Sequence, residues 1–274
     1  MYMRAINFII HFIGISTYLS AQVSESVSTP LVIGETVSFY SNELEENRSF
    51  NIYLPYGYDE EDNQRYPVIY LLDGSIDEDF LHIVGLVQFG AFPWIKMIPP
   101  SIVVGIENVD RKRDFTYPST DDRDKAGFPT SGGSADFISY LSEELMPFIK
   151  SQYKVNDTTT LIGQSLGGLC ATEILFSHSA IFTNYIIVSP SLWWDHENIL
   201  KRETSHLSNS QSVYIAVGNE GDVMERVAQE LYKVFSNHPK VYFNHLPDKD
   251  HGDALHLAVY NAFEAIFSTK ENKK

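Results

Sequence analysis

The segment that most constrains the fold runs from Thr158 to Leu169 and reads TTTLIGQSLGGL. It begins as a β-branched and apolar run typical of a strand, passes through Gly-x-Ser-x-Gly, and continues at once into an apolar helical pattern. A serine on a sharp turn between a strand and a helix is the arrangement known as a nucleophile elbow. Gly163 and Gly167 suit that turn because a side chain at either position would collide with a neighbouring element. We therefore predict that Ser165 is a nucleophile at the tip of a strand.

The rest of the chain predicts strands and helices that alternate around this turn. Two segments near residues 37–40 and 50–54 alternate apolar and polar side chains, as half-buried antiparallel strands do. Later runs are almost wholly apolar, the pattern of strands buried on both faces of a parallel sheet: 67–72, 101–106, 185–188 and 213–217. We predict an α/β protein with the α/β-hydrolase fold: a mostly parallel, doubly wound sheet with antiparallel N-terminal strands and helices on both faces.

The N-terminus reads as an export signal. Arg4 precedes an apolar stretch of residues 5–19, and Ser20 and Ala21 offer a small-residue cleavage site. The stretch is shorter than the roughly 20 apolar residues of a membrane span. We predict a signal peptide over residues 1–21, with an uncleaved membrane anchor as the alternative. A single α/β domain over residues 22–274 would then act in the periplasm or outside the cell.

Charge and motif content exclude several classes of partner and cofactor. The formal net charge is −16, with 36 acidic and 20 basic residues, which argues against nucleic acid because phosphate binding needs a basic patch. Paired His or Cys residues at metal-ligand spacing, Gly-x-Gly-x-x-Gly and the P-loop pattern are absent, so we expect no metal and no nucleotide cofactor. Cys170 is the single cysteine, which rules out an intramolecular disulfide, and its apolar neighbours indicate a buried, inert thiol.

The ends of two later strands predict the groups that would activate the serine. A serine hydroxyl is a weak nucleophile and needs a base to take its proton. His251 follows the last predicted strand in a glycine-containing loop, which is where an α/β-hydrolase places that base. Glu220 and Asp222 both follow the strand at 213–217, and either could hold the imidazole. We prefer Glu220, because Asp222 is placed to cap the helix that begins near Val223.

The tetrahedral intermediate of acyl transfer needs two backbone N–H donors. One would come from Leu166, directly after the nucleophile. The other would come from Ser75, after the strand at 67–72, where Gly74 lets the chain turn sharply.

Six ordered motifs resemble the putative-esterase family of α/β-hydrolases: PVIYLLDG, ENVDRKRDFT, LIGQSLGGL, SPSLWWD, VGNEGD and DKDHG. The resemblance spans about residues 36–267. That family includes the enterochelin (siderophore) esterases, feruloyl and acetyl esterases, S-formylglutathione hydrolase and the mycolyl transferases. By position, the resemblance implies the nucleophile at Ser165, the histidine at His251, the acid within Asn219-Glu220, and oxyanion donors at Ser75 and Leu166. Gln164 departs from the siderophore-esterase branch, which usually has histidine there.

We therefore expect an exported serine esterase that works through an acyl-enzyme on a small-molecule or oligosaccharide ester. A ferric siderophore of the trilactone or catecholate type would suit Trp193, Trp194, Arg111 and Arg113, because aromatic rings stack and guanidinium groups pair with anions. The alternatives are a packed loop for the tryptophans and ion pairs with Asp110 and Asp114 for the arginines. The polar segment 107–133, which carries these arginines, is predicted to be an ordered loop over the active site.

Two other functions fit the same chain. A feruloyl or acetyl ester on a polysaccharide would use the same serine chemistry. A non-catalytic binding module could keep the fold, although such a module has no use for a complete set of serine, acid and histidine.

Overall fold

The computed structural model describes residues 27–204 and 206–267 of the 274-residue chain. The chain divides into two units between Val32 and Ile33, and residues 27–32 of the first unit contain no helix or strand. The predicted signal peptide and its cleavage point lie outside the described residues. Everything that follows concerns the second unit.

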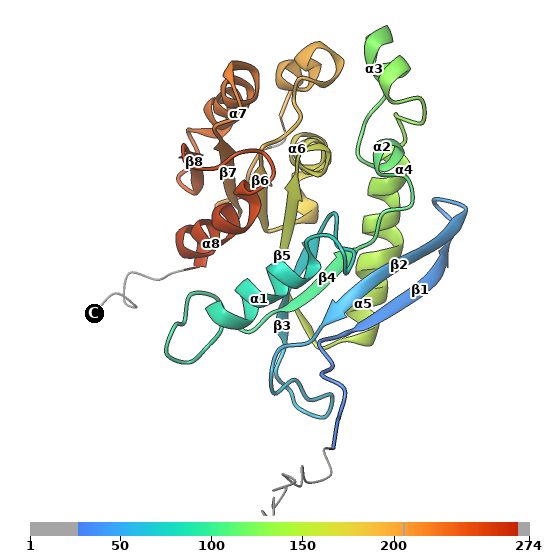
Figure 1. Ribbon diagram of the computed structural model, residues 1–274, viewed down its shortest axis with the longest axis vertical. Helices are drawn as coiled ribbons and strands as arrows, with labels where there is room; N and C mark the ends of the chain where they lie inside the picture. The colour runs from blue at the N-terminus through green and yellow to red at the C-terminus, as the bar shows by residue number, and fades with distance from the viewer. Residues whose placement is uncertain (1–26, 205, 268–274) are drawn as a thin grey trace, which may run out of the picture. The chain divides into compact units, whose positions relative to one another are not determined.

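Eight strands form one sheet in the order β1-β2-β4-β3-β5-β6-β7-β8 (Figure 1). β1 pairs antiparallel with β2, and β2 antiparallel with β4, whereas every other pair is parallel. The bounds are β1 (Glu35–Ser41), β2 (Glu46–Tyr53), β3 (Tyr66–Leu71), β4 (Ile102–Ile106), β5 (Val155–Gln164), β6 (Asn184–Val188), β7 (Ser212–Gly218) and β8 (Val241–Leu246). The predicted mostly parallel sheet with antiparallel N-terminal strands is confirmed.

Two apolar cores lie on the two faces of this sheet. One is built with α1 (Phe80–Gly90) and α8 (Ala254–Phe267), which pack against each other and against alternate residues of the central strands. The other is larger, and its helices are α4 (Ser134–Ser139), α5 (Met146–Gln152), α6 (Leu166–Ser177) and α7 (Asp222–Phe235). β3, β4, β6 and β7 are buried along their whole length because each face of the sheet meets a helical layer, which explains their unbroken apolar runs.

Two segments between β4 and β5 have irregular helical structure. Residues 134–152 are not one uniform helix, since the π-helical turn η1 (Tyr140–Leu145) separates α4 from α5. The segment 107–133 is ordered, and it carries two short helices, α2 (Arg111–Asp114) and α3 (Asp122–Gly127). Cys170 is fully buried on α6, and burial raises the pKa of its thiol, as expected of a packing residue.

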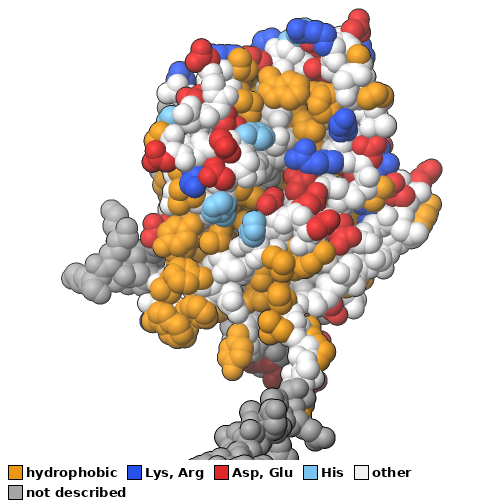
Figure 2. Space-filling model, in the orientation of Figure 1, with side chains coloured by type: hydrophobic (Ala, Val, Ile, Leu, Met, Phe, Trp, Pro, Cys, Tyr) orange, Lys and Arg blue, Asp and Glu red, His pale blue; other side chains and the backbone are white. Residues whose placement is uncertain are grey.

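The surface in Figure 2 carries acidic side chains over much of its middle, in keeping with the net charge of −16. Within the described residues, no helix combines the length and apolar character that a membrane crossing requires.

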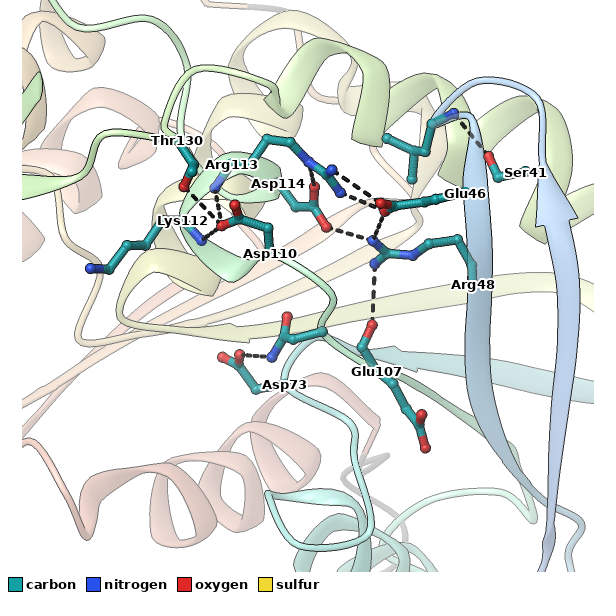
Figure 3. Close-up of polar contacts among 12 residues, drawn as sticks. Ser41, Glu46, Arg48, Asp73, Glu107, Asp110, Lys112, Arg113, Asp114 and Thr130 are labelled. Carbon is teal, nitrogen blue, oxygen red and sulfur yellow. Dashed lines mark hydrogen bonds and ion pairs between the residues drawn. The ribbon is translucent and has the colours of Figure 1, made fainter.

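A buried ion-pair network fastens the segment 107–133 to the sheet. Figure 3 shows its four side chains: Glu46, Arg48, Arg113 and Asp114. Arg48 and Asp114 both have fully buried side chains, and Arg48 NH1 lies 2.7 Å from Asp114 Oδ2. Arg113 donates from Nε to Asp114 Oδ1 at 2.7 Å and pairs with Glu46. The network therefore links β2 to α2 and fixes where the loop lies.

Replacement of Asp114 by Asn should lower the free energy of unfolding by about 3 kcal/mol or more, because Arg48 would stay buried without its closest counter-charge. Urea unfolding of the purified protein measures this loss. Lys125→Gln, which removes one partner of an exposed pair on α3, is the matched control and should leave the midpoint almost unchanged. Equal midpoints for wild type and Asp114→Asn would contradict the role given to the network.

Candidate active site

Ser165 stands between the end of β5 and the start of α6 with a strained backbone. Its φ of 57° and ψ of −119° are rare for a residue with a side chain. A Cβ on Gly163 would lie 2.3 Å from the carbonyl oxygen of Gly167, so only glycine fits there. A Cβ on Gly167 would lie 3.3 Å from Oδ2 of Asp73, whereas a Cβ on Gly168 would lie 3.0 Å from the Cα of Pro190. The elbow predicted from the sequence is present, although Gly168 is more tightly enclosed than Gly167.

A cavity of about 530 Å³ opens at the hydroxyl of Ser165. We call it the serine cavity. Its other lining residues are Ser191, Trp193, Asn219, Glu220, Met224, Asp250 and His251. They follow the ends of β6, β7 and β8, so three strand ends and the elbow converge on one hollow.

The imidazole of His251 is held by Glu220. Nδ1 of His251 lies 2.5 Å from Oε2 of Glu220, whose side chain is only 3% exposed. The other carboxylate oxygen accepts hydrogen bonds from the backbone N–H of Gly218 at 2.9 Å and from the hydroxyl of Ser189. With Nδ1 engaged, Nε2 is the ring nitrogen left to take a proton from a serine. The Oγ of Ser165, which lines the same cavity, lies 3.4 Å from the Oγ of Ser191.

These contacts move the pKa values of both groups. Burial acts to raise the pKa of Glu220, but hydrogen bonds from His251, Ser189 and Gly218 outweigh it, and the pKa lies below its ordinary value. The hydrogen bond to Glu220 raises the pKa of His251, and burial of the ring opposes this only in part.

The structure separates the two candidate acids. Asp222 is exposed at the first residue of α7, whereas the side chain of Glu220 lies against His251. The predicted cap role for Asp222 was wrong. Gly221 is the N-cap of α7, and Oε1 of Glu225 accepts from the N–H groups of Glu220 and Gly221.

The two candidate oxyanion donors differ in their surroundings. Leu166 provides the first N–H of α6, beside the nucleophile. Ser75 follows Gly74, where a Cβ would lie 2.3 Å from the Cα of Gly105. The N–H of Ser75 donates to Oε2 of Glu78 at 3.3 Å, and Ser75 is not among the residues that line the serine cavity.

The predicted substrate-binding residues fall into two groups. Trp193 lines the serine cavity, whereas Trp194 is fully buried and donates from Nε1 to the carbonyl of Tyr117 at 2.8 Å. Trp194 therefore belongs to a packed loop, and its predicted contact with substrate was wrong. Arg113 is engaged in the buried network with Asp114.

Arg111 has a partner that sequence reasoning missed. Its guanidinium forms two hydrogen bonds with Asp73, Nε to Oδ1 at 2.6 Å and NH2 to Oδ2 at 2.8 Å. NH2 also reaches the carbonyl oxygen of Gln164 at 3.3 Å. Asp73 lies two residues past the end of β3 and has a φ of 56°. The pair therefore ties the loop before Ser75 to the residue before the nucleophile.

Gln164 was noticed in the sequence only as a departure from a family pattern. Its Nε2 donates to the backbone carbonyl of His251 at 2.6 Å. His251 is thus held from two sides, by Glu220 at the ring and by Gln164 at the main chain. No sequence signal pairs residues 87 positions apart, so only the fold could reveal this contact.

The chain is similar to known esterases over most of its length. The model of the family described as "Putative esterase" matches residues 41–256. Ferri-bacillibactin esterase BesA of Bacillus subtilis is 30% identical over 211 residues, covering 69% of this chain and 73% of that protein. Siderophore triacetylfusarinine C esterase of Aspergillus fumigatus is 26% identical over 206 residues, covering 69% of this chain and 68% of that protein.

Solved structures show the same fold. An IroE-like serine hydrolase from Shewanella oneidensis superposes with a TM-score of 0.74 and 26% identity, over 85% of this chain and 80% of that one. The BES protein from Bacillus cereus gives a TM-score of 0.75 and 25% identity, over 90% of this chain and 100% of that one. The predicted α/β-hydrolase fold is confirmed.

Activity should fall as pH decreases through a value above the ordinary histidine pKa of about 6.5, because His251 must be neutral to accept a proton and its pKa is raised. Glu220→Gln removes the main cause of that rise, so the acid limb of the kcat/KM profile should move to lower pH while the plateau drops severely. The profile is measured with p-nitrophenyl acetate. Asp222→Asn is the matched control, and a shift of the limb there instead would assign the acid to Asp222.

Gln164→Glu should lower kcat about tenfold, because a carboxylate oxygen cannot donate to the carbonyl of His251 and small misplacements of a catalytic group are costly. Steady-state kinetics and the melting temperature of the same preparation check this. Gln152→Glu, a change of the same kind at an exposed site on α5, should match the wild type. An unchanged kcat in Gln164→Glu would remove Gln164 from the account.

Proposed function

The chain belongs to the Putative esterase family and is a carboxylic ester hydrolase of the α/β-hydrolase fold, and from that premise we propose that it works through an acyl-enzyme on Ser165. The observation that carries the proposal is the close contact between Nδ1 of His251 and Glu220 at the edge of the cavity that also contains the Ser165 hydroxyl. Such a serine, histidine and carboxylate set turns a weak nucleophile into a reactive one.

In the first step, the Oγ of Ser165 attacks the ester carbonyl carbon while Nε2 of His251 takes the hydroxyl proton. Glu220 keeps the imidazole in the tautomer with Nδ1 protonated, and its charge stabilises the imidazolium that forms. The tetrahedral intermediate then collapses, and His251 gives its proton to the departing alkoxide. In the second step, the oxygen of a water molecule attacks the acyl carbon while Nε2 of His251 takes a proton from that water. The second tetrahedral intermediate then collapses, His251 gives the proton to Oγ of Ser165, and the acid leaves.

The negative charge of each intermediate would be met by the N–H groups of Leu166 and Ser75. Leu166 lies at the N-terminus of α6, where the helix dipole adds to the stabilisation. In the free protein, Ser75 is engaged by the exposed carboxylate of Glu78 at 3.3 Å, so that side chain has to turn away when substrate binds. The bidentate pair of Arg111 and Asp73 would hold the Ser75 loop at a fixed distance from the elbow.

We propose a siderophore ester as the substrate class. The support comes from relatives, since BesA is named for a ferric siderophore and the fungal relative for another siderophore. Trp193 offers an aromatic wall beside the serine, which suits a ligand with flat or apolar groups. A feruloyl or acetyl ester on a polysaccharide is the second candidate, because it needs the same wall and the same serine chemistry. A non-catalytic module is disfavoured because a serine, a histidine and a carboxylate that holds this histidine all line one cavity.

We also propose a place of action, and its support comes from the N-terminal sequence. The export signal expected over residues 1–21 would deliver a domain of residues 22–274 to the periplasm or the cell exterior. There the enzyme would release iron or a sugar-bound acyl group by cleaving the ester.

Ser165→Ala should lower the turnover of p-nitrophenyl acetate by several orders of magnitude while leaving the melting temperature nearly unchanged, because the nucleophile is lost and the fold is not. A fluorophosphonate probe should label wild type at Ser165 and leave the variant unlabelled. Ser191→Ala is the control, since its hydroxyl lies 3.4 Å from that of Ser165 and should not be labelled in its place. Labelling of any other serine would refute the assignment.

A further inference from the structure

Asn51 is a buried polar residue of the sheet that contacts the loop carrying Ser75. It lies on β2 and is 4% exposed. Its Nδ2 donates two hydrogen bonds, to the backbone carbonyl of Gly74 at 2.9 Å and to Oε1 of Glu107 at 3.0 Å. The bond to Gly74 concerns the active site, because that carbonyl belongs to the same peptide unit as the N–H of Ser75.

The neighbours of Asn51 set the orientation of its amide. Thr36 lies opposite Asn51 in the register of β1 and β2, and its hydroxyl donates to Oδ1 of Asn51 at 2.6 Å. A rotated amide would place Oδ1 against two acceptors, the carbonyl of Gly74 and the carboxylate of Glu107. The NH2 group therefore faces the Gly74 carbonyl, and the oxygen and both hydrogens of the amide are bonded.

The backbone of β4 leaves room for this contact. Gly105 is the residue of β4 that pairs with Asn51 of β2. A Cβ on Gly105 would lie 2.5 Å from the carbonyl oxygen of Gly74, so that oxygen occupies the space above a bare Cα. The N–H of Gly74 donates to the carbonyl of Ile106 at 2.9 Å. Gly74 is thus held at its N–H by β4 and at its carbonyl by β2.

The planarity of the peptide bond transmits this contact to Ser75. In a trans peptide the C=O and the following N–H point in opposite directions, and the described residues contain no cis peptide bond. The Gly74 carbonyl points toward β2, so the Ser75 N–H points away from β2. In the strand order β2-β4-β3-β5, that direction leads to β5, which ends at Gln164 directly before the nucleophile (Figure 1). The bond of this N–H to the exposed Glu78 side chain, at 3.3 Å, is the one that substrate has to replace.

We propose that Asn51 is a positioning residue for the oxyanion donor, because its amide fixes the peptide plane between Gly74 and Ser75. The proposal rests on the esterase function proposed above and adds a residue that does not touch the substrate. The pair of Arg111 and Asp73 holds the loop in place, whereas Asn51 sets the direction of one N–H within it. A donor that is already aimed stabilises the developing charge without having to reorient during the reaction.

Replacement of Asn51 by Leu removes the donor and keeps a similar side-chain volume. We expect kcat/KM for p-nitrophenyl acetate to fall about tenfold, which is less than the loss of roughly 10²–10³ for a deleted oxyanion donor, because the N–H is misdirected but still present. The inhibition constant of butylboronic acid should rise by a similar factor, since its tetrahedral adduct needs the same donors. Rates are expressed per site labelled by the fluorophosphonate probe, so unfolded protein does not count.

Asn184→Leu is the matched control. Asn184 is also a buried strand asparagine, 5% exposed, and its Nδ2 donates to the hydroxyl of Thr160 at 3.2 Å. It is the first residue of β6, whereas the nucleophile follows the residue that pairs with the last residue of β6. Both Leu variants should lower the melting temperature, because each leaves buried polar groups unpaired. Asn184→Leu should keep the wild-type kcat/KM and the wild-type inhibition by butylboronic acid.

A second variant, Asn51→Ser, covers the case in which Asn51→Leu does not fold, because a smaller side chain leaves room for a water molecule. Its kcat/KM should fall about fivefold.

The outcomes separate the two proposals. A folded Asn51 variant with wild-type kcat/KM per labelled site, or with lowered kcat/KM but unchanged inhibition by butylboronic acid, would refute the positioning role and leave the esterase function standing. An equal loss in Asn184→Leu would also refute it. If the wild type hydrolyses no ester, the proposed function fails, and the positioning role fails with it.

Discussion

The left-handed backbone of Ser165 is the constraint on which the rest of the structure depends. A residue in this region costs about 1–3 kcal/mol and persists only when its neighbours enforce it. Here the N–H of Ser165 donates to the carbonyl of Val188 at 3.1 Å, and the bare Cα of Gly163 lets α6 start directly beside β5. Asp73 and Ser189, which follow β3 and β6, also have positive φ values, of 56° and 45°. Three neighbouring strands thus end in sharp turns that aim side chains at a common edge of the sheet.

Each of these turns positions a different part of the site. Asp73 holds Arg111 and with it the loop toward Ser75, whereas Ser189 donates its hydroxyl to the carboxylate of Glu220. Gln164 adds a hydrogen bond to the main chain of His251, so the histidine is oriented by the last residue of β5 and by Glu220 in the loop after β7. Such support matters because a catalytic group must stay within a fraction of an ångström of its productive position. The buried network around Arg48 extends the same support to the segment 107–133, which carries Arg111.

The sequence was sufficient for the fold and for the groups at the elbow, because both depend on local signals. Apolar runs identified the buried strands, and Gly-x-Ser-x-Gly identified the turn. The remaining details depend on long-range contacts. Nothing local distinguishes Trp193 from Trp194, yet the left-handed run that follows them leaves the first in the cavity and the second in the core. Likewise, Asp73 is 38 residues from Arg111, so local charge pairing missed the partner of Arg111, although Arg113 does pair with the nearby Asp114.

The most direct test of the central claim is to trap the covalent intermediate. A p-nitrophenyl ester of a bulky acid, such as pivalate, should acylate the enzyme faster than water can release it. Acid quenching during turnover, followed by peptide mapping with mass spectrometry, locates the acyl group. The account predicts a burst of one p-nitrophenol per active site and an acyl group on the peptide that contains Ser165. Steady turnover with an unmodified Ser165, or an acyl group on any other residue, would contradict it.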